Sequence, residues 1–265
     1  LWAYVPYNLL PHLYWLTEKN YPHVYYNDMQ PKVFDAKIFF KADGVTPLDD
    51  DHPNGWGTLM VIGMRLGGGE INVDMDKNDV FDSAVDRTMN SAYIIFDITN
   101  PESAPKVLAE ITLDQQGYTN VYPAVIPMRS KYGTAPSISF DSNDWYLVFG
   151  SGPADSSGKA ASHDSLEDIL AQGISKQTGK LYVLNLNKLT DEASPVVQTL
   201  NTAGQLTNTA PFYIQELEAN SFVSQPITVD YDLDFNADTV YFGTISGSES
   251  NGWGGKLRRL LINND

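Results

Sequence analysis

The sequence predicts an all-β fold, namely a modified β-propeller of four-stranded antiparallel blades with long loop insertions and short surface helices. Two observations predict it. Runs rich in Val, Ile, Tyr and Phe dominate the chain after residue 20, and such runs are typical of strands. These runs also repeat in kind, because each apolar run reaches a glycine and a loop of small residues before a second strand begins. Repeated four-stranded units are typical of propellers.

The first predicted unit covers about residues 22–113. Its strands are expected at 31–40, 56–69, 91–99 and 104–112. This unit is expected to form one four-stranded antiparallel sheet.

The second predicted unit covers about residues 120–201 and repeats the same plan. Its strands are expected at 121–129, 144–158, 179–187 and 194–201. The last of these, SPVVQTLN, is expected to complete the second sheet as its fourth strand.

The third predicted unit, about residues 221–265, is incomplete. Three strands are expected there, at 224–232, 238–252 and 255–263. The repeat is longer than an ordinary blade, and the excess residues fall in predicted insertions, which are typically functional or mobile when they are this long. These insertions lie at 70–90, 153–178 and 202–220.

Two short surface helices are expected outside the strands. One covers 7–16 and is interrupted by Pro11, and the other covers 164–173, where Gly173 is a suitable C-cap. Two and a half blades cannot close a ring, so open sheet edges are expected. The chain, which begins at Leu1, is therefore interpreted as part of a larger propeller. The alternative is an irregular β-sandwich.

The amino-acid composition excludes several classes of function. Of the 265 residues, 42% are hydrophobic, which is sufficient for a sizeable core. The net charge is −16, and a surface so acidic disfavours nucleic acid and favours metal cations or basic partners. Cysteine is absent, which excludes disulfides and thiolate metal sites. No apolar run is long enough to span a membrane.

One short stretch concentrates acidic residues at metal-loop spacing. DYDLDFNADTV (230–240) places acids or Asn at every second position from 230 to 238. In EF-hand-type loops, side chains at positions 1, 3, 5 and 9 and a backbone carbonyl at position 7 surround calcium. Position 6 of such loops is normally Gly, but here it is Phe235. The first-choice ligands are Asp230, Asp232, Asp234, Asp238 and the carbonyl of Asn236. The alternative is a solvated cluster at a strand end.

A second stretch, DMDKNDVFD (74–82), has the same spacing inside the first insertion. Its position 6 is Asp79, which tolerates a left-handed backbone better than Phe does. The second-choice ligands are Asp74, Asp76, Asn78, Asp82 and the carbonyl of Val80. An insertion that is acidic only for solubility is the alternative.

Other polar stretches give weaker signals. DDDHP (49–53) is interpreted as a solvated loop. The four histidines, at 12, 23, 52 and 163, include no pair at the spacing of a metal-binding helix.

Several motifs, taken in order, resemble the C-terminal domain of the PilY-type type IV pilus biogenesis factors. LWAYVPYNLLPHLYWL (1–16) resembles a strand and helix of that family, and the resemblance continues through residue 244, which lies after the predicted metal loop. It is carried by GWGTLMVIGMRLGGG (55–69), WYLVFGSGP (145–153), TGKLYVLNL (178–186) and QPITVDYDLDFNADTVYFGT (225–244).

The resemblance implies a non-enzymatic, calcium-binding propeller that is exported and displayed at the cell surface, at the pilus tip or on the outer membrane. It places the family's calcium loop on residues 230–238, and it implies that calcium regulates pilus extension and retraction, twitching motility and attachment. Pilin or minor pilin subunits and a host or abiotic surface are the implied partners. The sequence departs from the family at Phe235 and in the insertion 70–90.

Two alternatives come from other classes. TGKLYVLNL also resembles blade motifs of pyrroloquinoline-quinone dehydrogenases, although the acid, Arg and Trp groups of such a cofactor site do not assemble here. A metal-free structural propeller is the other alternative.

Overall fold

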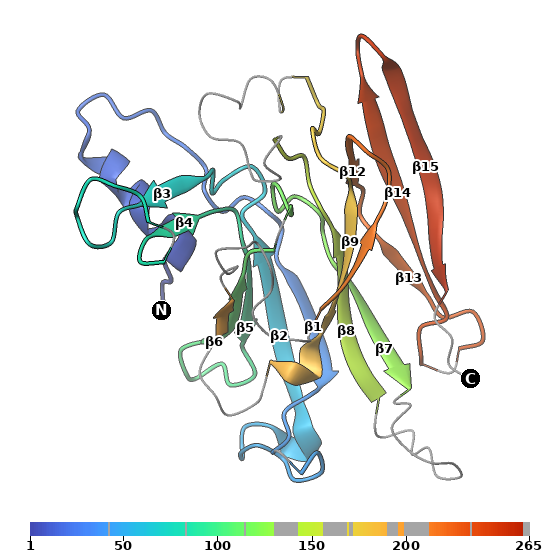
Figure 1. Cartoon of the computed structure of the whole chain (residues 1–265). Coiled ribbons are helices and arrows are strands. Elements are labelled where there is room, and N and C mark those ends of the chain that lie inside the picture. Colours follow the sequence, from blue (N-terminus) through green and yellow to red (C-terminus); the bar gives the residue numbers. More distant parts are fainter. Residues whose placement is uncertain are drawn as a thin grey trace.

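The computed structural model confirms the prediction of an all-β fold built from antiparallel sheets (Figure 1). Three larger sheets and one two-stranded sheet contain the described strands, and the longest described helix is the 3-10 helix η1 (Tyr7–Thr17), at a predicted helical position. The structure describes residues 1–41, 43–82, 84–113, 115–129, 143–155, 169, 172–189, 196–198, 212–233 and 235–261. Most of the predicted helix 164–173 lies outside these residues.

The first sheet contains the four predicted strands of the first unit in chain order. They are antiparallel neighbours, and residues of β2 alternate strictly between buried and partly exposed after its first position. This period of two places Leu59 and Val61 in the core. The strands are β1 (Lys32–Lys37), β2 (Trp56–Gly63), β5 (Tyr93–Asp97) and β6 (Lys106–Ile111).

The insertion between β2 and β5 forms a small hairpin of its own. Its strands are β3 (Ile71–Val73) and β4 (Arg87–Met89), which pair antiparallel. Figure 1 shows this hairpin at the side of the molecule beside η1, away from the other sheets.

The second sheet has the order β11-β9-β8-β7. Three of its strands lie where the sequence predicted them, namely β7 (Ala124–Arg129), β8 (Asn143–Gly150) and β9 (Lys180–Asn185). The fourth strand is β11 (Phe212–Glu216), from a segment that had been assigned to an insertion.

The prediction that residues 194–201 complete the second sheet is therefore wrong. Within that segment, β10 (Val196–Gln198) pairs parallel with β6, at the edge of the first sheet. The short 3-10 helix η5 (Leu186–Lys188) follows β9, and the next described strand, β10, belongs to the neighbouring sheet. The open edge of β9 is then available to β11, whose Ile214 lies opposite Tyr182.

The third sheet is built around the long strand β14 (Thr239–Ser248). One edge of β14 pairs along its whole length with β15 (Gly252–Leu261). Its other edge pairs in turn with β13 (Ile227–Val229) and β12 (Ser221–Val223). Ser224 bridges the break between those two strands, because its N–H donates to the Gly243 carbonyl and its Oγ accepts from the Gly243 N–H, both at 2.9 Å.

The second sheet packs against a neighbouring sheet on each of its two faces. Along β8, Leu147 and Phe149 belong to the core shared with the first sheet, whereas Val148 belongs to the core shared with the third. The alternation of side chains along a strand produces this division. In the first core, the Phe149 ring lies 4.6 Å from that of Tyr93. The three sheets thus pack in succession, as propeller blades do.

A buried glutamate fixes the N-terminal segment to the first sheet. The carboxylate of Glu110, on β6, accepts hydrogen bonds from the N–H groups of Tyr7 and Asn8 at 2.8 Å, and the Tyr4 hydroxyl donates to it at 2.9 Å. Burial, together with the negative charge of Glu110, raises the pKa of Tyr4. The carboxylate satisfies N–H groups at the start of η1 that have no partner within the helix. Within the part of the chain that the structure describes, no helix has the length and apolar character needed to cross a bilayer.

Candidate metal centres

The first candidate loop connects β13 to β14. Carboxylate oxygens of Asp230, Asp232 and Asp238 all lie within 4.8 Å of one another. Asp234, the fourth predicted acidic ligand, lies outside the described residues. The chain therefore brings together three of the four predicted carboxylates in a space that suits one small cation.

The back of this loop is fixed to the body of the protein. Asn236 and Ala237 are buried, and the N–H of Ala237 donates to the Pro127 carbonyl of β7 at 2.9 Å. The N–H of Asp238 donates to the Val229 carbonyl at 3.0 Å, which closes the loop between its two strands. The carboxylates are thus held on a rigid base.

The backbone of the loop wraps around its first carboxylate. Asp230 accepts hydrogen bonds from the N–H of Leu233 at 2.7 Å and of Phe235 at 2.9 Å. Asp238 accepts from the N–H of Tyr231 at 2.7 Å. Leu233 and Phe235 both have left-handed backbone conformations, with φ of 62° and 68°. The sharp turn expected at position 6 is therefore present, although a bulky residue occupies it.

The second candidate loop, between β3 and β4, folds in the same way. Asp74 accepts from the N–H of Lys77 at 2.5 Å and of Asp79 at 2.8 Å, and these two donors have φ of 59° and 62°. Asp86 accepts from the N–H of Met75 at 2.6 Å. Asp74, Asp76 and Asp86 offer oxygens that all lie within 4.8 Å of one another. In both loops, therefore, the aspartate at position 1 accepts the N–H groups of positions 4 and 6, and the closing aspartate accepts the N–H of position 2.

The loop 74–86 is closed by an aspartate that sequence reasoning missed. Asp86 is only 6% exposed, and its second oxygen accepts from the N–H of Asp82 at 2.7 Å. The carboxylate of Asp82 instead accepts from the N–H of Ala84 at 2.9 Å. The signal that could have identified Asp86 is its place directly before a strand, because Asp238 also directly precedes one.

Two further predicted ligands of this loop support its turn. The side-chain amide of Asn78 donates to Asp76 Oδ2 at 2.9 Å, and Asn78 Oδ1 accepts from the N–H of Val80 at 2.8 Å. The side chain of Val80 is exposed, and its predicted contribution is only through its carbonyl.

The proximity of its acids perturbs the titration of the loop 74–86. Desolvation, a hydrogen bond with Asp74 and the charge of Asp86 raise the pKa of Asp76. Desolvation also acts to raise the pKa of Asp74, but donation from the N–H groups of Asp79 and Lys77 outweighs it and leaves that pKa lowered. Like charges this close repel each other, and a bound cation would remove the repulsion.

The donor chemistry of both loops fits calcium. All convergent side-chain ligands are carboxylate oxygens, which are hard ligands, and calcium takes six to eight oxygens in flexible geometry. Three carboxylates supply up to six oxygens. The predicted backbone carbonyls and water would complete the shell.

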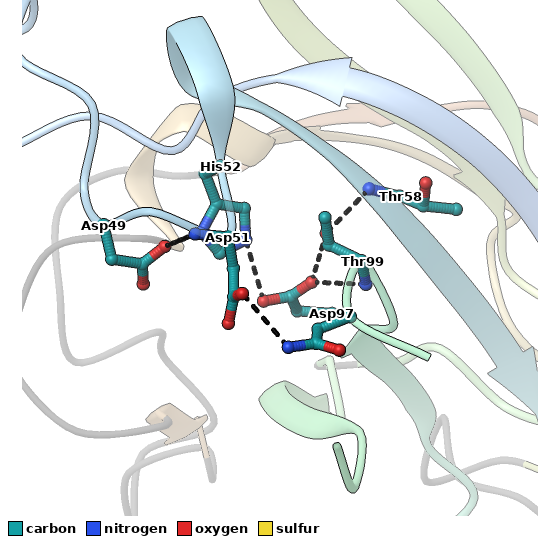
Figure 2. A network of polar contacts seen from close by, with 7 residues as sticks. Asp49, Asp51, His52, Thr58, Asp97 and Thr99 are labelled. Carbon is teal, nitrogen blue, oxygen red and sulfur yellow. Dashed lines mark hydrogen bonds and ion pairs between the residues drawn. The ribbon is translucent and has the colours of Figure 1, made fainter. Parts of the chain in front are cut away.

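A separate polar network surrounds the buried His52 (Figure 2). His52 Nδ1 contacts Asp49 Oδ1 at 2.5 Å, and Nε2 contacts Asp97 Oδ2 at 3.0 Å. The Thr99 hydroxyl donates to the other oxygen of Asp97 at 2.6 Å, and the imidazole stacks on Phe39 at 3.8 Å. The acids at 49–51 are exposed, as the solvated-loop interpretation of 49–53 expects, but His52 is buried.

Because a carboxylate engages each nitrogen of His52, neither is directed at a metal. His12 contacts the Gly69 carbonyl at 3.2 Å, and burial lowers its pKa. His163 lies outside the described residues. None of the described histidines therefore belongs to either carboxylate cluster.

Comparison with known proteins finds similarity among solved structures. No protein-family model matches the chain, and no curated protein matches it. The matched structure is the crystal structure of the Pseudomonas aeruginosa PilY1 C-terminal domain, at 18% sequence identity and a TM-score of 0.44. The match covers 97% of this chain and 33% of the PilY1 chain, so this chain spans about a third of the length of the protein that it matches.

Proposed function

We propose that this chain is a non-enzymatic, calcium-binding factor of type IV pilus biogenesis and adhesion, in which calcium occupancy regulates pilus extension, retraction and attachment. The observation that carries the calcium part is the convergence of Asp230, Asp232 and Asp238 in a loop with a fixed base. The pilus part is supported by the ordered motifs that resemble the PilY-type factors. Pilin or minor pilin subunits are the proposed partners, and the proposed place of action is the cell surface.

Calcium would act at this loop through the strands that it joins. A cation among the three carboxylates neutralises their repulsion and connects the end of β13 to the start of β14. By linkage, a metal that is present at a hundred times its dissociation constant stabilises the fold by about 2.7 kcal/mol. A change in calcium concentration would thereby alter the rigidity of the third sheet.

Calcium titration of the melting temperature tests the binding proposal. The wild-type protein is expected to melt at higher temperature as calcium rises, whereas Asp230→Ala loses most of this rise. Asp43→Ala is the matched control, because Asp43 also accepts N–H donors in an exposed turn, from Val45 and Thr46, but belongs to neither of the two carboxylate clusters found among the described residues. A wild-type protein whose melting temperature ignores calcium would refute the proposal.

The pilus assignment needs a separate measurement in cells. Cells would express the protein with Asp230→Ala, and their surface piliation and twitching would be compared with wild type in calcium-rich and chelated medium. Calcium-dependent twitching is expected for wild type only. Reduction of a redox dye by the purified protein with pyrroloquinoline quinone and calcium would instead favour the dehydrogenase alternative.

A further inference from the structure

The last strand of the third sheet has one open edge. β15 pairs with β14 over ten residues, and no other described strand pairs with it. Figure 1 shows it as the outermost strand at its side of the molecule. A long edge of this kind is a template for pairing with another chain unless bulges, proline or charge protect it.

The backbone groups that face this edge can be assigned. Lys256 N–H donates to Thr244 Oγ1 at 3.3 Å, and the Leu260 carbonyl accepts from Thr239 Oγ1 at 2.9 Å, so the even-numbered residues of β15 direct their polar groups to β14. In an antiparallel ladder, alternate residues direct theirs to the opposite edge. The N–H and C=O groups of Leu257 and Arg259 therefore point outward.

The side chains of the same odd-numbered residues form an exposed apolar face. Leu257 is 79% exposed, and Trp253 and Leu261 are also exposed. Tyr241 and Ile245 of β14 lie on this face as well, since Tyr241 is paired with Arg259 and Ile245 with Gly255. The opposite face of the sheet packs inside, with Val240 and Phe242 in the second core.

The charge on β15 contrasts with that of the whole chain. Lys256, Arg258 and Arg259 give the strand three cations and no acid, in a chain of net charge −16. Glu218 pairs with Arg258 at 2.7 Å and with Lys256 at 3.3 Å on the inner face. Those two bonds outweigh the effect of burial and lower the pKa of Glu218. Among the described residues, no acid pairs with Arg259 on the outer face.

We propose that the open edge of β15 binds an extended segment of another protein by strand addition. The outward backbone groups supply the hydrogen bonds of such a complex, and alternate side chains supply its specificity. The segment is expected to place an acidic side chain opposite Arg259 and apolar side chains against Leu257 and Leu261. A second copy of β15 is disfavoured, because pairing the strand with itself would bring its cations together.

A pair of synthetic peptides tests this proposal on the intact chain. One is a ten-residue strand that alternates Val with Thr and has a single Glu in place of one central Val, and its twin has Lys in place of that Glu. Binding is measured by titration calorimetry, and amide exchange at Leu257 and Arg259 shows where the peptide lies. The Glu peptide is expected to bind about tenfold tighter than its Lys twin, since an opposed charge pair replaces a like-charge pair. It should also protect both amides.

Two variants separate charge from backbone pairing. Arg259→Glu is expected to reverse the preference between the peptides, whereas the control Lys106→Glu, on β6, leaves it unchanged. Leu257→Pro removes an outward N–H and should abolish binding of either peptide, with circular dichroism confirming that the sheet remains. Equal binding of both peptides, binding without protection of β15, or a concentration-dependent dimer that occupies this edge would overturn the proposal.

Discussion

The two acidic loops share one backbone design but differ in what lies behind them. In each, the first aspartate accepts N–H groups from the residues three and five positions later, and the closing aspartate accepts the N–H of the second residue. The loop 230–238 joins two strands of a main sheet and is bonded to β7 through Ala237. The loop 74–86 instead joins the strands of a peripheral hairpin.

Because of this difference, two loops with the same local geometry are expected to affect the stability of the whole protein differently. A cation in the loop 230–238 would stabilise strands whose residues Val240 and Phe242 belong to the second core. A cation in the loop 74–86 would order three-residue strands that belong to none of the three larger sheets. Similar binding sites can therefore have global or local effects, depending on the element that holds them.

The largest expected effect of this contrast is on calcium-dependent melting. At a hundred times the dissociation constant, calcium should raise the melting temperature of wild type by about 5–10 °C, because the linkage energy is of the order of 2.7 kcal/mol. Asp74→Ala is expected to keep nearly all of this rise. It should lose calcium-dependent protection of residues 71–89 against limited proteolysis, which Asp230→Ala should retain.

Scanning calorimetry and peptide mapping on the same samples distinguish the two loops. Asp43→Ala again serves as the control for loss of an exposed acid. If Asp74→Ala removed the rise in melting temperature while Asp230→Ala kept it, the assignment of global and local roles would be reversed.

The sequence was sufficient for the first four strands of the first sheet, because their alternation is local and strong. It also located the strained sixth position, where Phe235 has φ of 68°. It failed where pairing is non-local. Whether Val196–Gln198 or Phe212–Glu216 lies beside β9 depends on the edges that remain open after the sheets assemble, and periodicity within a short strand does not contain that information.

Asp86 illustrates the same limit inside the candidate site. The fixed spacing of a calcium loop directs attention to Asp82, but the hairpin brings the next aspartate into the cluster instead. The number of residues between Asp79, at position 6, and the closing Asp86 depends on where β4 begins, and the fold determines that point. Only the first six positions of the loop follow from local chain geometry.

A smaller effect is expected from the residue at position 6. Phe235→Gly should stabilise the protein by about 0.5–1 kcal/mol, since relief of a left-handed non-glycine conformation exceeds the added flexibility of the unfolded chain. Little burial is lost, because Phe235 is 85% exposed. Asp79→Gly, at the equivalent position, should gain less, because Asp tolerates this conformation. Denaturant unfolding without metal measures both, and an equal gain would contradict the argument from side-chain type.

The smallest effect concerns the metal-free charge of the loop 74–86. The pKa of Asp76 is raised in the folded protein, so its contribution to stability is present below the unfolded pKa and is lost as pH rises through the folded value. Asp76→Asn should therefore raise the melting temperature slightly at neutral pH without calcium, and this gain should disappear in acid. The same variant should weaken calcium-dependent protection of the hairpin.

Asp43 provides a control of opposite sign for this experiment. Hydrogen bonds from the Thr46 side chain and the Val45 and Thr46 N–H groups lower its pKa to about 2. Its contribution is present above the unfolded pKa and is lost as pH falls through the folded value, so Asp43→Asn should lower the melting temperature at neutral pH. Melting curves at several pH values with a chelator present compare the two. A fall in melting temperature for Asp76→Asn would show that its hydrogen bonds outweigh the repulsion, and the need for a cation at that loop would then disappear.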